Sequence, residues 1–151
     1  MYKNTKIICF DLDGVLINSI KNMSFAWKMT CVKNNIKIPF SRYKKFIIGI
    51  ITSKNKIRVN KILKKLKIKF DFIYTPDDLK RGKPHPDAII EIKKKFNVKS
   101  SEIIYLGDTK YDLKFSKNSK INFLFAKWGY GSIVGKKVNK IKKISEIYNF
   151  L

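Results

Sequence analysis

Short apolar runs typical of buried β-strands alternate with segments of helical spacing along the whole chain. The predicted strands cover residues 6–11, 46–51, 72–74, 103–106 and 122–126. The predicted helices cover residues 20–35, 56–67 and 86–96, with two more starting near Asp112 and Ile144. This alternation predicts an α/β fold in which helices cover both faces of a parallel sheet. In such a sheet, binding residues gather at the carboxyl ends of the strands.

The length of 151 residues predicts one domain over residues 1–151. Hydrophobic residues make up 44% of the chain and aromatic residues 13%, which is too many for a disordered chain. No apolar run approaches the ~20 residues that cross a membrane, and the first residues lack a secretory signal pattern. Cys9 and Cys31 form neither a disulfide framework nor a zinc pattern. We therefore expect a cytoplasmic protein without a membrane partner.

The chain carries 34 Lys and Arg residues against 11 Asp and Glu, a net charge of +23. Such a charge suggests anionic partners, nucleic acid among them. Only Arg42, Arg58 and Arg81 are arginines, however, and the guanidinium fork is the group that reads bases and grips phosphate. Nucleic acid therefore stays open as a partner without being favoured. The same charge would attract a phosphorylated small molecule.

Carboxylates stand where the predicted strands end. Four of the acidic residues share this position: Asp11, Asp13, Asp108 and Asp112. Oxygen ligands of this kind suit Mg²⁺, which binds one or two carboxylates together with phosphate and water. Thr52 and Lys83 also follow strands and offer a hydroxyl and a cation to phosphate oxygens. The pattern predicts a metal and phosphate site.

Four stretches resemble, in order, the motifs of haloacid dehalogenase-superfamily phosphatases. They are residues 11–16 (DLDGVL), 50–54 (IITSK), 82–87 (GKPHPD) and 106–112 (LGDTKYD). The lysine stretch and residues 128–131 (WGYG) are similar to the phosphoglycolate phosphatase-like branch. The resemblance implies a three-layer Rossmann-like core with a central parallel sheet.

The resemblance also implies roles for residues at these positions. Asp11 would attack phosphorus and form an aspartyl-phosphate, as carboxylates do in covalent catalysis. Asp13 would protonate the leaving oxygen and then activate water. Thr52, Ser53 and Lys83 would bind the phosphoryl group.

The implied cofactor is Mg²⁺. Asp11, Asp108 and the backbone carbonyl of Asp13 would hold the ion, while Asp112 would orient these ligands through water or Lys83. Metal and lysine together would remove most of the repulsion between a carboxylate and an anionic substrate.

The chain departs from that branch between its first two motifs, because only 38 residues separate Asp13 from Thr52. Residues 19–49 resemble the opening of the helical cap, so we expect a cap remnant or linking helix there and a cap that is minimal or absent. A reduced cap is compatible with several outcomes. They are an open site for large substrates, a site sealed by a partner subunit, an enzyme of weak and broad activity, and a catalytically decayed core. Phe25 and Trp27 either belong to the core face of the predicted helix or are exposed where a cap would cover them; if they are exposed, they would favour a homodimer.

The leading hypothesis is a Mg²⁺-dependent phosphomonoester hydrolase similar to phosphoglycolate phosphatase, acting on a phosphorylated small molecule. A phosphate-transferring mutase ranks lower, because such enzymes use a cap to shield the aspartyl-phosphate from water. Two further hypotheses are a phosphatase of nucleic-acid ends and a basic binding module on a decayed core.

Overall fold

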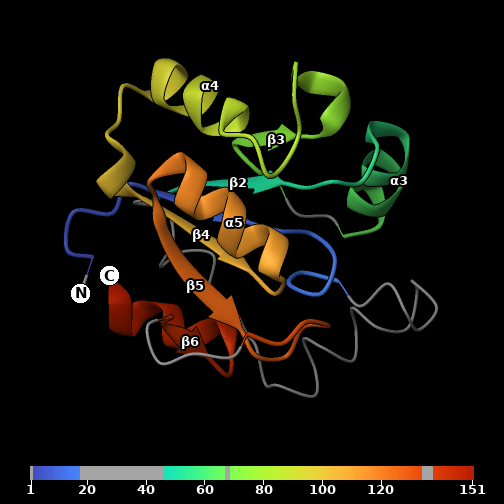
Figure 1. Cartoon of the computed structure of the whole chain (residues 1–151). Coiled ribbons are helices and arrows are strands. Elements are labelled where there is room, and N and C mark those ends of the chain that lie inside the picture. Colours follow the sequence, from blue (N-terminus) through green and yellow to red (C-terminus); the bar gives the residue numbers. More distant parts are fainter. Residues whose placement is uncertain (1, 18–45, 67–68, 134–137) are drawn as a thin grey trace.

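Six parallel strands form one sheet in the order β3-β2-β1-β4-β5-β6 (Figure 1). The computed structural model describes residues 2–17, 46–66, 69–133 and 138–151. The strands are β1 (Ile7–Phe10), β2 (Ile47–Ile51), β3 (Phe72–Tyr74), β4 (Ile103–Gly107), β5 (Asn122–Ala126) and β6 (Lys140–Ile141). The chain adds β2 and β3 on one side of β1, then crosses to add β4 on its other side. This reversal is the place where parallel sheets bind ligands.

β1 lies at the centre of the fold because both of its faces are apolar. Ile8 and Phe10 point into one core cluster, whereas Ile7 and Cys9 point into the other. All four residues are buried, as expected of a strand covered on both faces. Burial also raises the pKa of the Cys9 thiol, which keeps this side chain neutral within the core.

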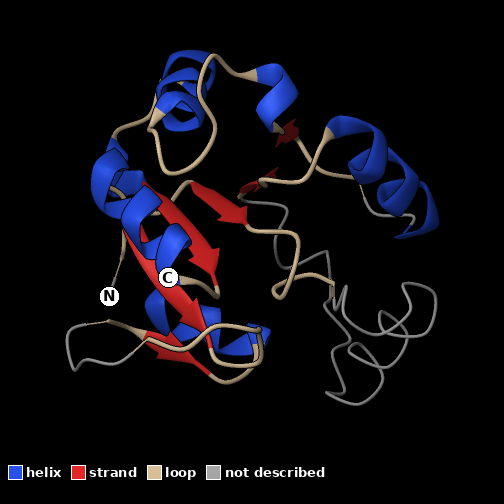
Figure 2. Cartoon of the chain, turned by 45° about the vertical axis from the view of Figure 1, so that its right-hand side comes forward, coloured by secondary structure: helices blue, strands red, loops and turns tan. Residues whose placement is uncertain are grey.

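Helices cover both faces of the sheet (Figure 2). The helices α4 (Asp87–Phe96) and α5 (Lys110–Ser119) pack on the face that carries Ile7 and Cys9. The helix α3 (Lys56–Leu66) and the 3₁₀ helix η3 (Ile144–Phe150) pack on the opposite face. Two shorter 3₁₀ helices, η1 (Pro76–Asp78) and η2 (Ser100–Glu102), connect strands to the elements that follow or precede them. The three layers confirm the predicted Rossmann-like architecture.

The five predicted strands and the helix at 86–96 are confirmed to within one or two residues at their ends. The short strand β6 escaped prediction because two residues show no periodicity. α5 begins at Lys110, ahead of Asp112, because the Thr109 side chain caps its first turn. The segment near Ile144 is a 3₁₀ helix. The predicted helix at 20–35 and residues 19–45 of the expected cap remnant lie outside the described residues.

The apolar face that helical spacing predicts for α3 is wrong at one residue. Ile57, Leu63 and Leu66 stand among lysines at helical spacing, which predicts that Ile57 faces the core, but its side chain is 70% exposed. Val59 and Ile62, three residues apart, are buried in its place. Because residues three apart lie on the same side of a helix, this pair defines the face that meets the sheet.

The beginning and end of the described chain lie side by side (Figure 1). The Tyr2 backbone N–H donates a hydrogen bond of 2.6 Å to the Phe150 carbonyl oxygen. Within the described residues, no helix combines the length and the apolar character needed to cross a bilayer.

The two isoleucines of α3 provide a matched test of this packing. Ile62→Ala should lower the free energy of unfolding by about 2–4 kcal/mol because it leaves a cavity in the core. Ile57→Ala should change it by less than about 0.5 kcal/mol because that side chain is largely in water. Urea unfolding of both variants checks the assignment, and equal losses would contradict it.

Candidate active site

Three functional side chains lie together because each follows the end of a neighbouring strand. Asp11 comes directly after β1, Thr52 after β2 and Asp108 after β4. β1 pairs with β2 on one side and with β4 on the other, so the three strand ends meet at one edge of the sheet. Asp11, Thr52 and Asp108 are all buried. The convergence predicted from the strand pattern is therefore present.

Lys83 links two of the carboxylates through its ammonium group. Nζ donates hydrogen bonds to Asp11 Oδ1 at 2.9 Å, to Asp112 Oδ1 at 2.7 Å and to the Tyr105 hydroxyl at 2.8 Å. These three acceptors match the three protons of an ammonium group. Because only 5% of the Lys83 side chain is exposed, the partners replace the water that a charged lysine otherwise needs.

Asp112 is held by the first turn of its own helix. Its Oδ2 accepts hydrogen bonds from the Thr109 hydroxyl at 2.6 Å and the Thr109 backbone N–H at 3.0 Å. In return the Asp112 backbone N–H donates to Thr109 Oγ1 at 3.2 Å, which completes a capping box. Oδ1 accepts from Lys83 and from Tyr105, whose hydroxyl lies 2.9 Å away. Both carboxylate oxygens of Asp112 are therefore occupied by protein donors.

Backbone atoms pack closely around the Asp108 side chain. A side chain at Gly14 or Gly129 would overlap it, since a Cβ there would lie 2.1 Å from Asp108 Oδ2 or 2.2 Å from Asp108 Cβ. Gly14 also has φ +78°, a conformation that side chains rarely adopt. The Tyr130 backbone N–H donates to Asp108 Oδ2 at 2.7 Å. Asp108 Oδ1 is buried and has no hydrogen-bond partner in the part of the chain that the structure describes.

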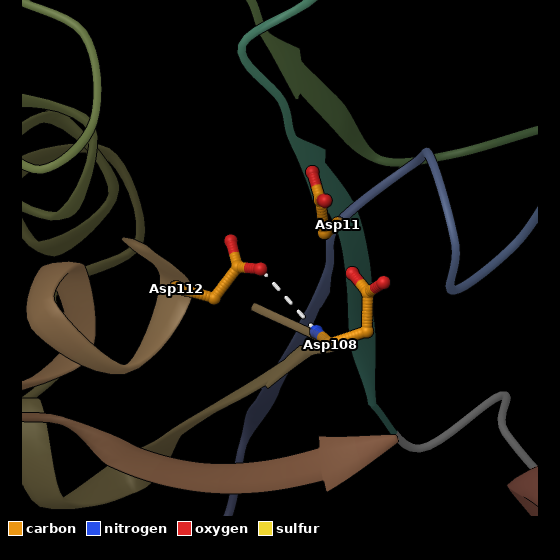
Figure 3. Close-up of side chains that lie close together, drawn as sticks. All are labelled: Asp11, Asp108 and Asp112. Carbon is orange, nitrogen blue, oxygen red and sulfur yellow. Dashed lines mark hydrogen bonds between the residues drawn. The ribbon is translucent and has the colours of Figure 1, made fainter. Parts of the chain in front are cut away.

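The carboxylates fit a hard divalent cation. Asp11, Asp108 and Asp112 each offer an oxygen within 4.8 Å of the other two, and Figure 3 shows the three side chains grouped at the strand ends. All-oxygen donors of this kind suit Mg²⁺. The unbonded Asp108 Oδ1 is a buried acceptor that a cation would satisfy. Since protein donors occupy Asp112, the oxygens open to a metal belong to Asp11 and Asp108.

Burial and the Lys83 ammonium act in opposite directions on the pKa values of Asp11 and Asp112: burial raises them and the lysine lowers them. Burial, with help from Asp112, raises the pKa of Asp11 to about 7, although Lys83 opposes the rise. Burial also raises the pKa of Asp108 above its usual range. For Asp112, burial would raise the pKa, but Lys83, Thr109 and Tyr105 together hold it below its usual value. Burial would lower the pKa of Lys83, but the two carboxylates raise it, so the lysine remains charged.

A pocket of about 540 Å³ opens above these groups. The Asp13 carboxylate lies on its wall, outside the metal cluster, and forms an ion pair with Lys54 at 3.2 Å. Thr52 Oγ1 accepts a hydrogen bond of 3.1 Å from the Lys54 backbone N–H, while Ser53 is exposed at the mouth. The lining residues are Asp11, Asp13, Thr52, Ser53, Lys54, Asn55, Arg58, Lys83, Thr109, Tyr111 and Asp112.

The structure brings the predicted site residues into one place. Six of them line the pocket, and Asp108 joins the carboxylate cluster beside it. His85 is exposed in the turn before α4, outside the pocket lining.

Sequence reasoning missed the roles of Tyr105, Lys54 and Thr109. Tyr105 interrupts an aliphatic strand, and a buried tyrosine needs a partner for its hydroxyl, which is the signal that could have found it.

The comparisons with known proteins agree with this geometry. Residues 42–126 match the family "Haloacid dehalogenase-like hydrolase". Two curated relatives are named pyrophosphatase PpaX. The one from Bacillus mycoides is 30% identical over 54% of this chain, and the one from Anoxybacillus flavithermus is 33% identical over 50%. The matched regions make up only 39% and 36% of those proteins.

Solved structures show the same fold. A haloacid dehalogenase-superfamily hydrolase of subfamily IA from Geobacter sulfurreducens gives a TM-score of 0.76 at 14% identity, covering 97% of this chain and 100% of that one. A protein described as a "predicted phosphoglycolate phosphatase" from Haemophilus somnus gives 0.77 at 15% identity, covering 97% and 98%. With the family match spanning more than half of the residues, the chain belongs to the haloacid dehalogenase-like hydrolases.

Proposed function

We propose that this chain is a Mg²⁺-dependent hydrolase of phosphate monoesters that forms an aspartyl-phosphate on Asp11. The observation that carries the proposal is the buried Lys83 ammonium, which joins Asp11 to Asp112 beside the unbonded oxygen of Asp108. This arrangement offers a nucleophile and a cation for phosphoryl oxygens in the pocket, with oxygen ligands for a divalent cation beside them. The names of the relatives support hydrolysis at phosphorus.

Asp11, Asp108 and the backbone carbonyl of Asp13 would hold the metal ion. When bound, Mg²⁺ supplies positive charge that offsets the repulsion between a carboxylate and a phosphate ester. Asp112 acts as a positioning residue, because its two oxygens hold Lys83 and the first turn of α5.

In the first step an oxygen of Asp11 bonds to phosphorus and the bond from phosphorus to the ester oxygen breaks. Lys83 holds Asp11 in place and neutralises charge on the phosphoryl oxygens. The Thr52 hydroxyl accepts from the Lys54 backbone N–H, so its own proton is available to a phosphoryl oxygen. Asp13 gives a proton to the departing ester oxygen.

In the second step water attacks the same phosphorus and the bond to Asp11 breaks. Asp13, now ionised, takes the proton from that water, which returns the acid to its starting form and releases phosphate. While Asp13 is ionised, its ion pair with Lys54 keeps the carboxylate on the pocket wall.

The substrate class is a phosphorylated small molecule. The relatives' names point to pyrophosphate and phosphoglycolate, and both are compact anions with a second charged group near the phosphorus. The matched regions cover well under half of the named pyrophosphatases. We therefore carry the relatives' substrates over to this chain only as part of the proposal.

Hydrolysis of an aryl phosphate tests the proposal. We expect Mg²⁺-dependent turnover by the wild-type chain and a fall of at least about a thousandfold in Asp11→Asn, because the nucleophile is lost. Glu91→Gln, on the exposed face of α4, is the charge-matched control and should retain full activity. A folded wild-type protein without turnover would favour a binding module on a decayed core, and turnover in Asp11→Asn would mean a different nucleophile.

Metal binding has a readout that does not depend on turnover. Mg²⁺ at about 100 times its Kd should stabilise the wild-type protein by about 2.7 kcal/mol. Asp108→Asn should remove most of this gain, since it replaces the oxygen that lacks a partner with a neutral amide. Thermal unfolding with and without Mg²⁺ measures both proteins, and an unchanged Mg²⁺ effect in Asp108→Asn would place the ion elsewhere.

The raised pKa of Asp11 predicts a pH dependence in the metal-free protein. Because this pKa is about 7 when folded, against an ordinary value of 3.8, the folded state binds more protons than the unfolded state between these values. The free energy of unfolding should therefore fall as pH rises through this range, by at most about 1.4 kcal/mol per pH unit.

Asp11→Asn lacks this titration. In a chelating buffer its stability relative to wild type should be higher at pH 8 than at pH 5, as urea unfolding at the two values would measure. A difference that is constant with pH would contradict the raised pKa.

A further inference from the structure

The cations inside the pocket already have carboxylate partners. Lys83 donates to Asp11 and Asp112, and Lys54 pairs with Asp13. With a divalent ion bound, the ion and these two lysines would already be engaged by the carboxylates of the site and by the phosphoryl group. The inner site then has no cation left for a negative charge on a substrate beyond the phosphoryl group.

Arg58 differs from these two lysines because it has no carboxylate partner among the described residues. It lies in the first turn of α3 and lines the pocket, and among the four exposed lining residues it alone is charged. No carboxylate in the described ranges forms an ion pair with its guanidinium. Arg81, the other described arginine, is paired with Asp87 at 2.9 Å. A guanidinium that faces a pocket without a carboxylate partner is available to an anion.

The pocket has space for such an anion. Its volume of about 540 Å³ falls within the ~300–1,000 Å³ of small-molecule sites and exceeds what one phosphoryl group fills. Arg58 follows β2, whereas Tyr111, which is 71% exposed, follows β4. β2 and β4 flank β1, so these two residues follow strands on opposite sides of β1, and both line the pocket.

We propose that Arg58 binds a second anionic group on the substrate, so that the site selects phosphate monoesters with an anionic tail over those with a neutral tail. The inference rests on the proposed hydrolase function and adds the residue that reads the tail. Phosphate and carboxylate share the chemistry that a guanidinium recognises, two oxygens spaced to accept a pair of parallel hydrogen bonds. The scissile phosphoryl group stays with Lys83 and Asp11.

Three esters of matched length test the proposal. They are propyl phosphate, the phosphate ester of 3-hydroxypropanoate and propane-1,3-diyl bisphosphate, whose tails are neutral, a carboxylate and a phosphate. Arg58→Gln should raise KM about tenfold for the anionic tails, the loss that 1.4 kcal/mol represents. It should leave kcat and the KM for propyl phosphate unchanged, because Arg58 does not contact the reacting phosphorus.

Two further variants separate charge from geometry. Arg58→Lys keeps the charge without the fork and should recover part of the lost affinity. Lys61→Gln removes an exposed charge from the same helix outside the pocket lining and should leave all three KM values unchanged. An equal KM change for all tails, a fall in kcat for propyl phosphate, or an equal effect of Lys61→Gln would overturn the proposal. The tail with the larger Arg58→Gln effect shows whether phosphate or carboxylate is preferred.

Equilibrium binding keeps this inference distinct from the proposed function. Calorimetry on the Asp11→Asn protein with Mg²⁺ present compares the bisphosphate with propyl phosphate, with and without Arg58→Gln. Tighter binding of the bisphosphate that Arg58→Gln removes would support the subsite even if the wild-type chain hydrolyses none of the esters. Equal affinities for the two compounds would overturn it, whatever the hydrolysis assay shows.

Discussion

The site depends on one buried ammonium group held between two carboxylates. Without Lys83, Asp11 and Asp112 would be like charges in a region largely closed to water, an arrangement that costs several kcal/mol. With Lys83 in place, each proton of the ammonium has an acceptor, and Tyr105 supplies the third. The lysine therefore sets the position of both carboxylates and the charge that a phosphate group would meet.

The surroundings of this charge network are mostly backbone. Gly14 and Gly129 approach Asp108 so closely that no side chain fits at either position, and the capping box of α5 aims Asp112 at Lys83. The glycines and the capping box each belong to a short stretch of chain. Each nevertheless acts on a residue that is distant in sequence and that the parallel sheet brings near. Rigidity of this kind suits electrostatic stabilisation, because oriented groups need not reorganise as charge develops on a substrate.

Much of the fold follows from local pattern. Apolar runs with helical segments between them predict a parallel sheet, and the carboxyl ends of its strands predict where Asp11, Thr52 and Asp108 meet. Sequence pattern failed where packing decides: Ile57 has the spacing of a core residue and is exposed, while the short strand β6 gains its place only by pairing with β5. Side-chain burial in a helix depends on which face meets the sheet, and spacing alone leaves that choice open.

The layered α/β architecture, the carboxylates at the strand ends and the family resemblance follow from local sequence, because strand ends, turns and motif spacing are encoded by neighbouring residues. The partners of the charged side chains emerge only in the folded molecule. Lys83 donates hydrogen bonds to Asp11 and Tyr105, Lys54 pairs with Asp13, and Arg58 lines the pocket without a carboxylate partner in the described chain. Lys83 lies 72 positions from Asp11. Ion pairing depends on distances in space and on the exclusion of water, and both arise only when the sheet has assembled and its helices have covered it.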